Sequence, residues 1–228
     1  MKRSRINDLL KETVNWLEKL NYKLPPFAYW TPKDWETKGH EFDEIRDNML
    51  GWDITDYNSG DFNKVGLLLF TIRNGNFNKK DKYTKKYAEK ILISMEGQLC
   101  PNHFHWNKME DIINRGGGNL QVQVWNSTEA EELDTTPVRI SIDGCHSTVD
   151  AGAIIRLTPG ESITLPARQY HSFWAEKGYG PVLIGEVSMV NDDNYDNRFY
   201  ETRDRFSTIE EDEAILYYLC NEYPQWNK

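Results

Sequence analysis

Residues 97–117 read GQLCPNHFHWNKMEDIINRGG, and the pair His103 and His105 is the most informative feature of this stretch. In a β-strand, residues two apart point to the same face, with their Cα atoms about 6.6 Å apart. The two imidazoles therefore project together, and Glu110 can return a carboxylate to the same side once the chain turns after Trp106. This pattern predicts a strand and a turn that together present metal ligands.

A third imidazole, His171, follows the stretch from Gly160 to Tyr170. Three imidazoles and one carboxylate suit a divalent transition metal and leave about two coordination positions for water or substrate oxygens. The other two histidines, His40 and His146, lie in a helical segment and in a turn, and we assign neither a metal role. The competing interpretation is that the His-x-His pair is a surface or packing feature.

Short apolar segments separated by turn residues follow one another after Gly60, a pattern typical of a β-sandwich or barrel. The predicted strands are 65–72, 87–95, 99–106, 120–125, 138–142, 153–157, 162–165, 170–175 and 182–190. The run of glycines at 116–118 lacks the lysine of a phosphate-binding loop, so it predicts a tight turn or a close approach of two chain segments.

The first sixty residues have a different pattern. Ile6, Leu9, Leu10 and Leu17 recur at helical spacing, and Pro25 and Pro26 end the helix. Short helices are expected near 33–37 and 42–48. We therefore predict a helical N-terminal arm over 1–60, packed on a β-barrel with a C-terminal extension over 61–228, the whole forming one structural domain. The apolar residues 214–219 are expected to form a last strand or helix.

Composition narrows the function classes. The chain has 228 residues, with 36 acidic and 27 basic side chains and a net charge of -9. An acidic chain is poorly suited to nonspecific binding of nucleic acid or an anionic membrane, and no apolar run approaches the roughly 20 residues of a membrane span. Three widely spaced cysteines and the lack of a secretory signal favour a reducing, cytoplasmic location.

The ligand pattern resembles the cupins. The spacing Gly97-x5-His103-x-His105-x4-Glu110-x6-Gly117 matches the first cupin motif, and Gly160-x5-Pro166 followed by His171 is similar to the second. In the second motif, Arg168 stands where glycine is usual, and the asparagine expected after His171 is absent. The resemblance implies a mainly β fold, a cupin-type β-barrel or jelly roll.

A resemblance to the D-lyxose isomerases, sugar isomerases of the cupin class, extends over nearly the whole chain. It is carried by segments that include KRSRINDLL (2–10), LGWDIT (50–55), HFHWNKMEDIINRGGGN (103–119), LTPGESITLP (157–166), YHSFWAE (170–176) and GEVSMVNDD (185–193). The resemblance implies a Mn²⁺-dependent enzyme that interconverts D-lyxose and D-xylulose, and D-mannose and D-fructose. It also implies His103, His105, Glu110 and His171 as metal ligands, and a homodimer.

Aldose–ketose interconversion moves a proton between adjacent carbons, so it needs an acid–base group and a cation near the substrate oxygens. Glu186 is the leading base candidate, because it lies in an otherwise apolar strand; an outward-facing position is the alternative. Lys108 lies between two ligands and is expected to orient or polarise substrate oxygens, unless it is an exposed turn residue. For Lys90 two interpretations have equal weight: a lysine inside the pocket, or a lysine at a strand edge whose ammonium reaches solvent.

Substrate contacts are the least constrained predictions. Asp193 follows the Glu186 strand and is expected to bind sugar hydroxyls, whereas Trp30, Phe104 and Trp174 are proposed as an apolar wall of the pocket. Two other functions fit the same ligand set: a cupin dioxygenase or oxidase, and a non-catalytic sugar-binding cupin. Lysines and a carboxylate near the metal favour a polyol over an apolar oxidisable substrate.

Overall fold

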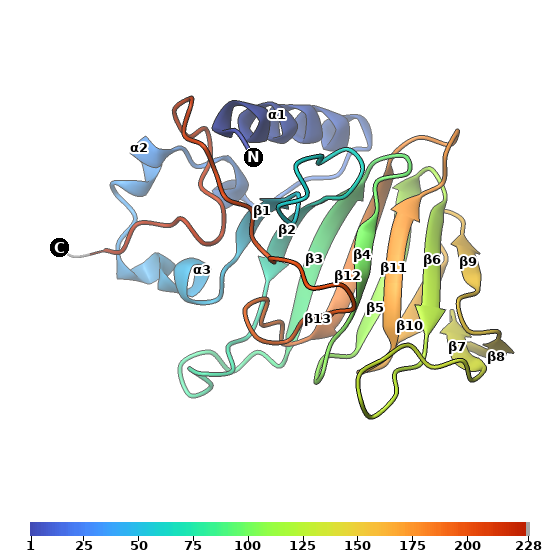
Figure 1. Ribbon diagram of the computed structural model, residues 1–228. Helices are drawn as coiled ribbons and strands as arrows, with labels where there is room; N and C mark the ends of the chain where they lie inside the picture. Colours follow the sequence, from blue (N-terminus) through green and yellow to red (C-terminus); the bar gives the residue numbers. More distant parts are fainter. Residues whose placement is uncertain (227–228) are drawn as a thin grey trace.

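Two antiparallel β-sheets face each other in the computed structural model, which describes residues 1–226 (Figure 1). The larger sheet has, in spatial order, β1 (Gly51–Thr55), β2 (Leu67–Arg73), β3 (Tyr87–Ser94), β12 (Val182–Met189), β5 (Glu110–Gly117), β10 (Ser162–Leu165), β7 (Val138–Ile142) and β8 (Cys145–Val149). The smaller sheet has β13 (Arg198–Phe199), β4 (Cys100–Phe104), β11 (Tyr170–Ala175), β6 (Leu120–Trp125) and β9 (Ile154–Leu157). The mainly β prediction is confirmed.

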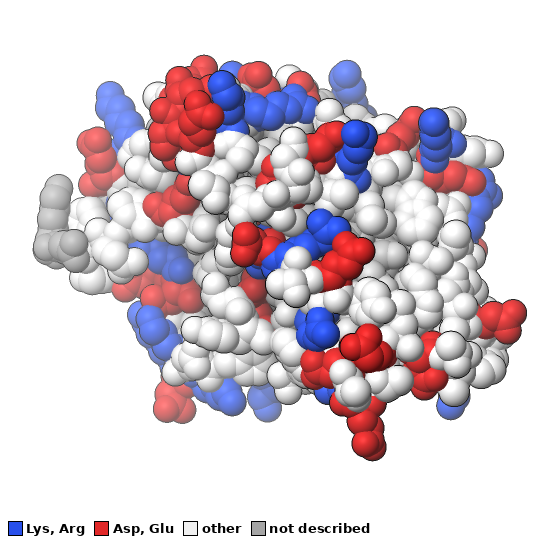
Figure 2. Space-filling model, in the orientation of Figure 1, with Lys and Arg blue, Asp and Glu red and all other residues white. Residues whose placement is uncertain are grey.

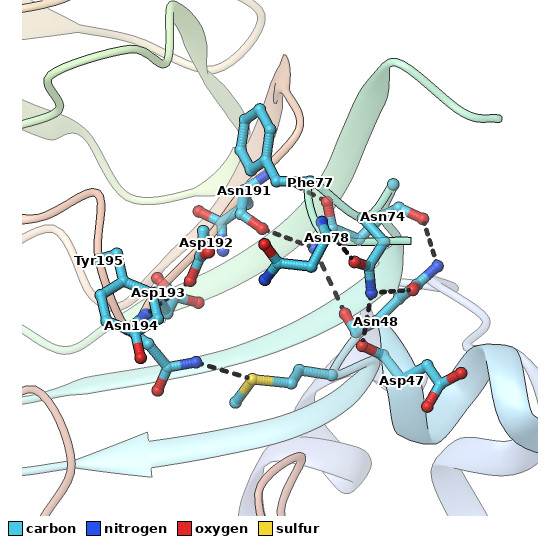
Figure 3. Close-up of a pocket in the computed structure, with 13 residues that line it drawn as sticks. Asp47, Asn48, Asn74, Phe77, Asn78, Asn191, Asp192, Asp193, Asn194 and Tyr195 are labelled. Carbon is cyan, nitrogen blue, oxygen red and sulfur yellow. Dashed lines mark hydrogen bonds between the residues drawn. The ribbon is translucent and has the colours of Figure 1, made fainter. Parts of the chain in front are cut away.

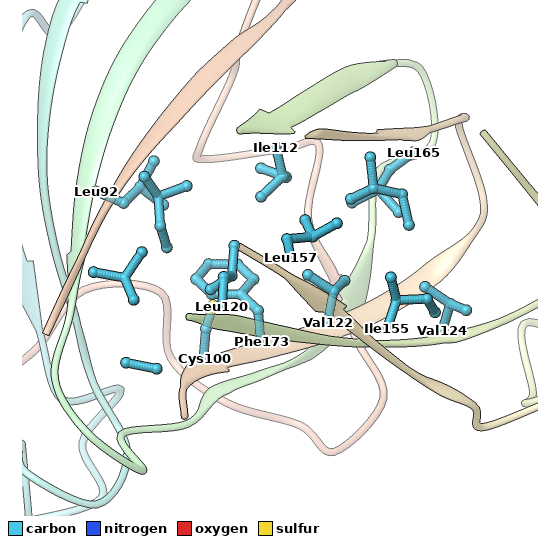
Figure 4. Packing of buried hydrophobic residues seen from close by; sticks show 14 of the residues in the cluster. Leu92, Cys100, Ile112, Leu120, Val122, Val124, Ile155, Leu157, Leu165 and Phe173 are labelled. Atoms are coloured by element: carbon cyan, nitrogen blue, oxygen red, sulfur yellow. The ribbon is translucent and has the colours of Figure 1, made fainter. Parts of the chain in front are cut away.

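Side-chain alternation along the strands separates the interior from the outer surface of the larger sheet. In β2, Leu67 and Leu69 join the core between the sheets, whereas Leu68 and Phe70 face the opposite side. The core between the sheets contains Leu92, Ile112 and residues of the smaller sheet such as Phe173 (Figure 4). Lys90 and Glu186 occupy inward positions on the same strands, two residues along from Leu92 and Ile184. The interior therefore changes from apolar to charged along the strand direction.

The outer face of the larger sheet is covered by the N-terminal helix, as predicted. Helix α1 (Arg3–Lys19) buries Ile6, Leu9, Leu10 and Leu17 against the outward side chains of β1, β2, β3 and β12. The chain then forms η1 (Pro26–Tyr29), α2 (Pro32–Trp35), η2 (His40–Phe42) and α3 (Asp43–Asp47). Thr31 and Asp34 form a reciprocal capping box at α2, which accounts for the start of the helix at Pro32.

The structure corrects several element predictions. The segment 1–60 is not wholly helical, because β1 pairs with β2 over its full length and forms one edge of the larger sheet. The carboxylate-bearing strand β5 and the strands β8 and β13 were also missed. Residues 214–219 form neither a helix nor a regular strand: Leu219 makes one isolated bridge to Trp52. Hydrogen bonds to distant segments, and not a helix or strand of its own, stabilise this extension.

The C-terminal segment runs back from β13 to the start of α1 (Figure 1). The guanidinium of Arg3 is fully buried and binds the carboxylates of Glu211, at 2.7 Å, and Glu222. Nearer the barrel, the Ser207 hydroxyl accepts the main-chain N–H of Asp56 at 2.8 Å. These contacts fix the path of residues 200–208 and place Arg205 in the cavity described below.

The glycine run at 116–118 makes the close approach that was predicted. Gly117 has a φ of 88°, and a Cβ atom on it would lie 2.3 Å from the carbonyl oxygen of Pro181. On the face shown in Figure 2, basic side chains are dispersed among acidic ones. Among the described residues, no helix is both long and apolar enough to cross a membrane.

Candidate active site

Three histidines from the smaller sheet converge on one point inside the barrel. His103 and His105 lie on β4 and just beyond its end, and His171 lies on β11 directly opposite His103 in the ladder. One ring nitrogen from each histidine lies within 4.8 Å of the others, and all three side chains are buried. The predicted convergence of these histidines is confirmed.

The second nitrogen of each ring is fixed by the main chain. The Nδ1 atoms of His103, His105 and His171 lie 2.7, 2.6 and 3.1 Å from the carbonyl oxygens of Pro101, Asp196 and Gln169. A carbonyl oxygen only accepts, so Nδ1 carries the proton and donates it. The Nε2 atoms are then left with a lone pair, which is the form that binds a metal. Burial and the neighbouring histidines hold the pKa of His103 well below its usual range, which keeps this ring neutral.

Glu110 completes the cluster from the first position of β5. Its Oε1 atom lies 3.1 Å from His171 Nε2 and 3.4 Å from His105 Nε2, and its Oε2 atom lies 2.7 Å from Lys108 Nζ. Burial alone would raise the pKa of Glu110, but the Lys108 ammonium holds it well below the usual range. The carboxylate is therefore ionised in the cluster.

This donor set fits a divalent cation. His171 Nε2 is buried and makes no hydrogen bond to the described residues, although the Glu110 carboxylate lies next to it. Imidazole lone pairs facing an ionised carboxylate repel one another unless a cation or proton lies between them. Three imidazole nitrogens and one carboxylate are ligands that Mn²⁺, Fe²⁺, Co²⁺ and Zn²⁺ accept.

Charged side chains from the larger sheet lie across the cavity from the histidines. Lys108 Nζ lies 2.8 Å from Glu186 Oε1, which in turn lies 3.6 Å from Lys90 Nζ. Lys90 Nζ also lies 3.6 Å from Asp193 Oδ2. The register explains the grouping: Lys90 and Glu186 are direct neighbours on β3 and β12. All four groups line one cavity together with His103, His105 and Glu110.

The charges in this cavity support one another. Burial disfavours the Lys108 ammonium, but Glu110, Glu186 and Asp193 raise the pKa of Lys108 above its usual value. Burial likewise opposes ionisation of Asp193, and Arg205, Lys90 and Lys108 lower the pKa of Asp193 far below its usual range. The cavity is thus lined by paired, ionised groups, a surface suited to a small molecule rich in hydroxyls.

Comparison with known proteins decides the family. The D-lyxose isomerase family profile matches residues 1–223. The chain is 49% identical to a D-lyxose/D-mannose isomerase of Escherichia coli O157:H7, over 99% of this chain and 100% of that protein. It is also 49% identical to a D-lyxose/D-mannose isomerase of Serratia proteamaculans, over 98% of each chain.

This chain belongs to the D-lyxose isomerase family. It is accordingly a sugar aldose–ketose isomerase. Among solved structures, it is similar to an L-ribose isomerase of Cellulomonas parahominis with L-psicose, with a TM-score of 0.61 and 15% identity. That match covers 92% of this chain and 98% of the other. The likeness supports the fold, and the cupin-type barrel prediction is confirmed.

In this D-lyxose isomerase family member, the predicted aromatic wall is not found. Phe104 lies between His103 and His105, so strand alternation turns it to the opposite face, where it packs on Trp106 and Tyr170. Trp174 lies three positions from His171 and faces away from it for the same reason. Trp30 packs against Trp35 and Phe42 within the helical arm. The apolar residues that do line the cavity include Leu67, Leu92, Ile112, Phe173 and Phe199.

Several polar residues of the family member's cavity were missed from the sequence. Arg205 reaches the cavity from the C-terminal segment, with its Nη2 atom 2.6 Å from Asp53 Oδ2 and 3.4 Å from Asp193 Oδ2. Its Nη1 atom is buried and has no hydrogen-bond partner in the part of the chain that the structure describes. Burial raises the pKa of Asp53, against the opposing effect of Arg205. Asp53 had a sequence signal, since it is a carboxylate between Trp52 and Ile54; Arg205 had none.

Asp196 was also missed, and it orients part of the histidine cluster. Its carbonyl oxygen accepts the His105 Nδ1 proton, and its carboxylate accepts the main-chain N–H groups of Asn107 and Lys108 at 3.0 and 3.1 Å. One residue thereby orients a histidine and the turn that carries Lys108. Partners of this kind fix the tautomer and direction of metal-binding histidines.

Proposed function

We propose that this enzyme interconverts D-lyxose and D-xylulose, and D-mannose and D-fructose, with a divalent metal held by His103, His105, Glu110 and His171. The observation that carries the proposal is that two sets of polar side chains face each other across one cavity. Three histidine Nε2 atoms and the Glu110 carboxylate converge on one side of a cavity, and Lys108, Glu186 and Lys90 line the other. The names of the two relatives at 49% identity support the choice of sugars.

The ion supplies Lewis-acid chemistry: when bound, it would stabilise negative charge on the two substrate oxygens that exchange carbonyl character. Mn²⁺ is the ion we expect. The charged lining favours a polyol substrate over the apolar substrate expected of an oxidase on the same scaffold. The other steps fall to side chains of the chain itself.

Glu186 is proposed to carry the proton between carbons. In the conversion of D-lyxose, its carboxylate removes the proton from C2 and returns it to C1, through an enediol. The side chain is only 6% exposed, so the proton is held away from bulk water. Glu186 Oε1 is kept in one position by Lys108 Nζ at 2.8 Å and by the Ser188 hydroxyl at 3.2 Å.

Lys108 is proposed to handle the oxygen proton. The proton on O2 of the aldose must leave as O1 gains one, and the Lys108 ammonium, buried beside Glu186, can donate one proton and accept the other. Lys90 and Asp193 are proposed to bind hydroxyl groups farther along the sugar. Arg205 Nη1, which lacks a partner among the described residues, is proposed to donate to another substrate oxygen.

A screen of aldopentoses and aldohexoses with Mn²⁺, read out as ketose formation, tests the assignment. We expect conversion of D-lyxose and D-mannose and little conversion of their C2 epimers, D-xylose and D-glucose. Oxygen consumption without ketose formation would overturn the proposal in favour of an oxidase. We also expect a homodimer in solution, which light scattering coupled to size-exclusion chromatography tests.

A further inference from the structure

A second cavity lies outside the histidine cluster, between three loops. It is lined by residues 47–49 after α3, residues 74–78 after β2 and residues 191–195 after β12 (Figure 3). Asp193 lines both this cavity and the cavity lined by His103 and His105. The segment 191–195 is therefore a wall between the two.

The amides around this outer cavity are largely used by the chain itself. Asn48 Nδ2 donates to the Asn74 carbonyl oxygen at 3.1 Å, and Asn74 Nδ2 donates to the Asn48 carbonyl oxygen at 3.3 Å. Asn76 Nδ2 donates to Asn48 Oδ1 and to the Asp47 carbonyl oxygen, each at 2.9 Å. Figure 3 shows these bonds joining the loops. The cluster thus holds loops in place and is not shaped to receive a ligand.

Asn74 has the central position in this cluster. Its Oδ1 atom accepts the main-chain N–H of Asn191 at 3.0 Å, and its Nδ2 atom donates to the Asn191 carbonyl oxygen at 2.9 Å. One side chain therefore holds both main-chain groups of a single residue. Asn74 is 4% exposed, so water does not compete freely for these bonds.

The residue held in this way contacts the catalytic groups. Asn191 Oδ1 accepts a hydrogen bond from Lys108 Nζ at 3.2 Å. Two residues later, Asp193 faces Lys90 and Arg205. The far end of the same segment is fixed by Asp196 through its bonds to His105 and Lys108. Asn74 is the corresponding attachment at the near end.

We propose that Asn74 is a positioning residue for isomerisation: by holding both main-chain groups of Asn191, it sets Asn191 and Asp193 against the substrate cavity. The proposal rests on the proposed function for its chemistry and on the hydrogen bonds above for its geometry. A displacement of about 1 Å in a substrate-holding group lowers turnover by roughly 10- to 100-fold. Asn74 touches neither the histidines nor the substrate cavity, so its effect must pass through the segment 191–195.

The test compares Asn74→Ala with Asn78→Ala in the metal-loaded full chain. Asn78 lines the same outer cavity but is exposed, and its side chain makes no hydrogen bond to the described residues. We expect Asn74→Ala to bind metal normally, to lose about 10- to 100-fold in kcat/KM for D-lyxose, and to exchange amide hydrogens faster in 191–197. Asn78→Ala should change none of these. Equal kcat/KM and equal exchange in the two variants would overturn the proposal.

A double-substitution cycle separates positioning from a general structural role. In an Asp193→Ala background, adding Asn74→Ala should cost less than it does in the wild-type chain, because one of the two groups that Asn74 positions is already gone. If the two substitutions lower kcat/KM by fully multiplicative factors, the proposal is contradicted.

If Asn74→Ala does not fold, amide exchange in the wild-type chain still tests the proposal. An Asn191 amide that exchanges as fast as an amide in an unstructured peptide would overturn the proposal. If the wild-type chain isomerises no sugar, the proposed function is contradicted instead. Amide hydrogen exchange would then still test whether Asn74 holds the main chain of Asn191.

Discussion

Lys108 and Glu186 form a buried ion pair, with Nζ and Oε1 2.8 Å apart and both side chains at most 6% exposed. Lys108 is in the turn before β5 and Glu186 is on β12, so the pair joins the segment that carries Glu110 to the opposite wall of the cavity. Buried ion pairs contribute little net stability, because desolvation offsets the attraction. We infer that this pair is retained for its chemistry.

Removal of the Lys108 charge should impair both catalysis and folding. In Lys108→Met, the carboxylates of Glu110 and Glu186 lose the ammonium that lies between them. We expect kcat to fall by about 100- to 1000-fold and the free energy of unfolding to fall by about 3–5 kcal/mol. Steady-state kinetics and urea unfolding measure the two effects. Lys86→Met, a change at an exposed lysine, is the control; a Lys108→Met enzyme of normal kcat would exclude Lys108 from the chemistry.

The carboxylate of Glu186 can be replaced with little change in shape. Glu186→Gln keeps an acceptor oxygen for Lys108 but cannot take up the carbon-bound proton. We expect normal metal content, near-normal substrate binding and a fall in kcat of at least about 100-fold. Deuterium incorporation from D₂O into the substrate carbons should be lost in parallel. Wild-type rates of isomerisation in this variant would move the base to another carboxylate, with Glu110 or Asp193 as the next candidates.

The histidine cluster predicts a loss of metal that can be measured without any activity assay. His171→Ala removes one of the three converging nitrogens, so metal content after dialysis should drop well below one ion per chain. The variant His146→Ala is the matched control, since His146 is exposed on β8. Elemental analysis reports both. A stoichiometric ion in His171→Ala would show that the ligand set is wrong.

Acid stability should depend on Asp47, which receives hydrogen bonds or ion pairs from Lys79, Lys82 and Tyr83. Despite partial burial, these partners lower the pKa of Asp47 to about 2 from an ordinary value of 3.8. A depressed folded-state pKa stabilises the fold above the unfolded value, and this contribution is lost as the pH falls toward 2. Asp47→Asn should therefore cost about 1–2 kcal/mol near pH 7, after allowance for the half-exposed lysines, and less near pH 3.

Urea unfolding at the two pH values checks this dependence on Asp47. Asp150→Asn, at an exposed aspartate that makes no ion pair among the described residues, should show no such change. A cost for Asp47→Asn that does not shrink with acid would mean that the lysines do not stabilise the carboxylate.

Much of this site follows from local sequence rules. The period of two along a strand places His103 and His105 on one face, and it also directs Lys90 and Glu186 inward with their apolar neighbours. The same rule, applied consistently, turns Phe104 outward, because it lies between the two histidines. Phe104 and Trp174 were proposed as pocket residues from their residue type, whereas position in the strand decides which face a side chain takes.

Other features depend on contacts that no local pattern encodes. Arg205 reaches the cavity because the C-terminal segment is tied to α1 and β1 by contacts such as Arg3 with Glu211 and Ser207 with Asp56. Strand β1 was missed because its length is five residues and its position is fixed by pairing with β2. Long-range contacts and the pairing of edge strands form only when the whole chain is folded, so a local sequence pattern does not predict them.

The central claim is that this fold isomerises a sugar through a metal held by His103, His105, Glu110 and His171. The most direct measurement is the rate of D-xylulose formation from D-lyxose by chelator-treated protein, before and during titration with Mn²⁺. We predict no turnover in the metal-free protein and a recovery that saturates at one ion per chain. Full turnover by protein shown to be free of metal would contradict the claim.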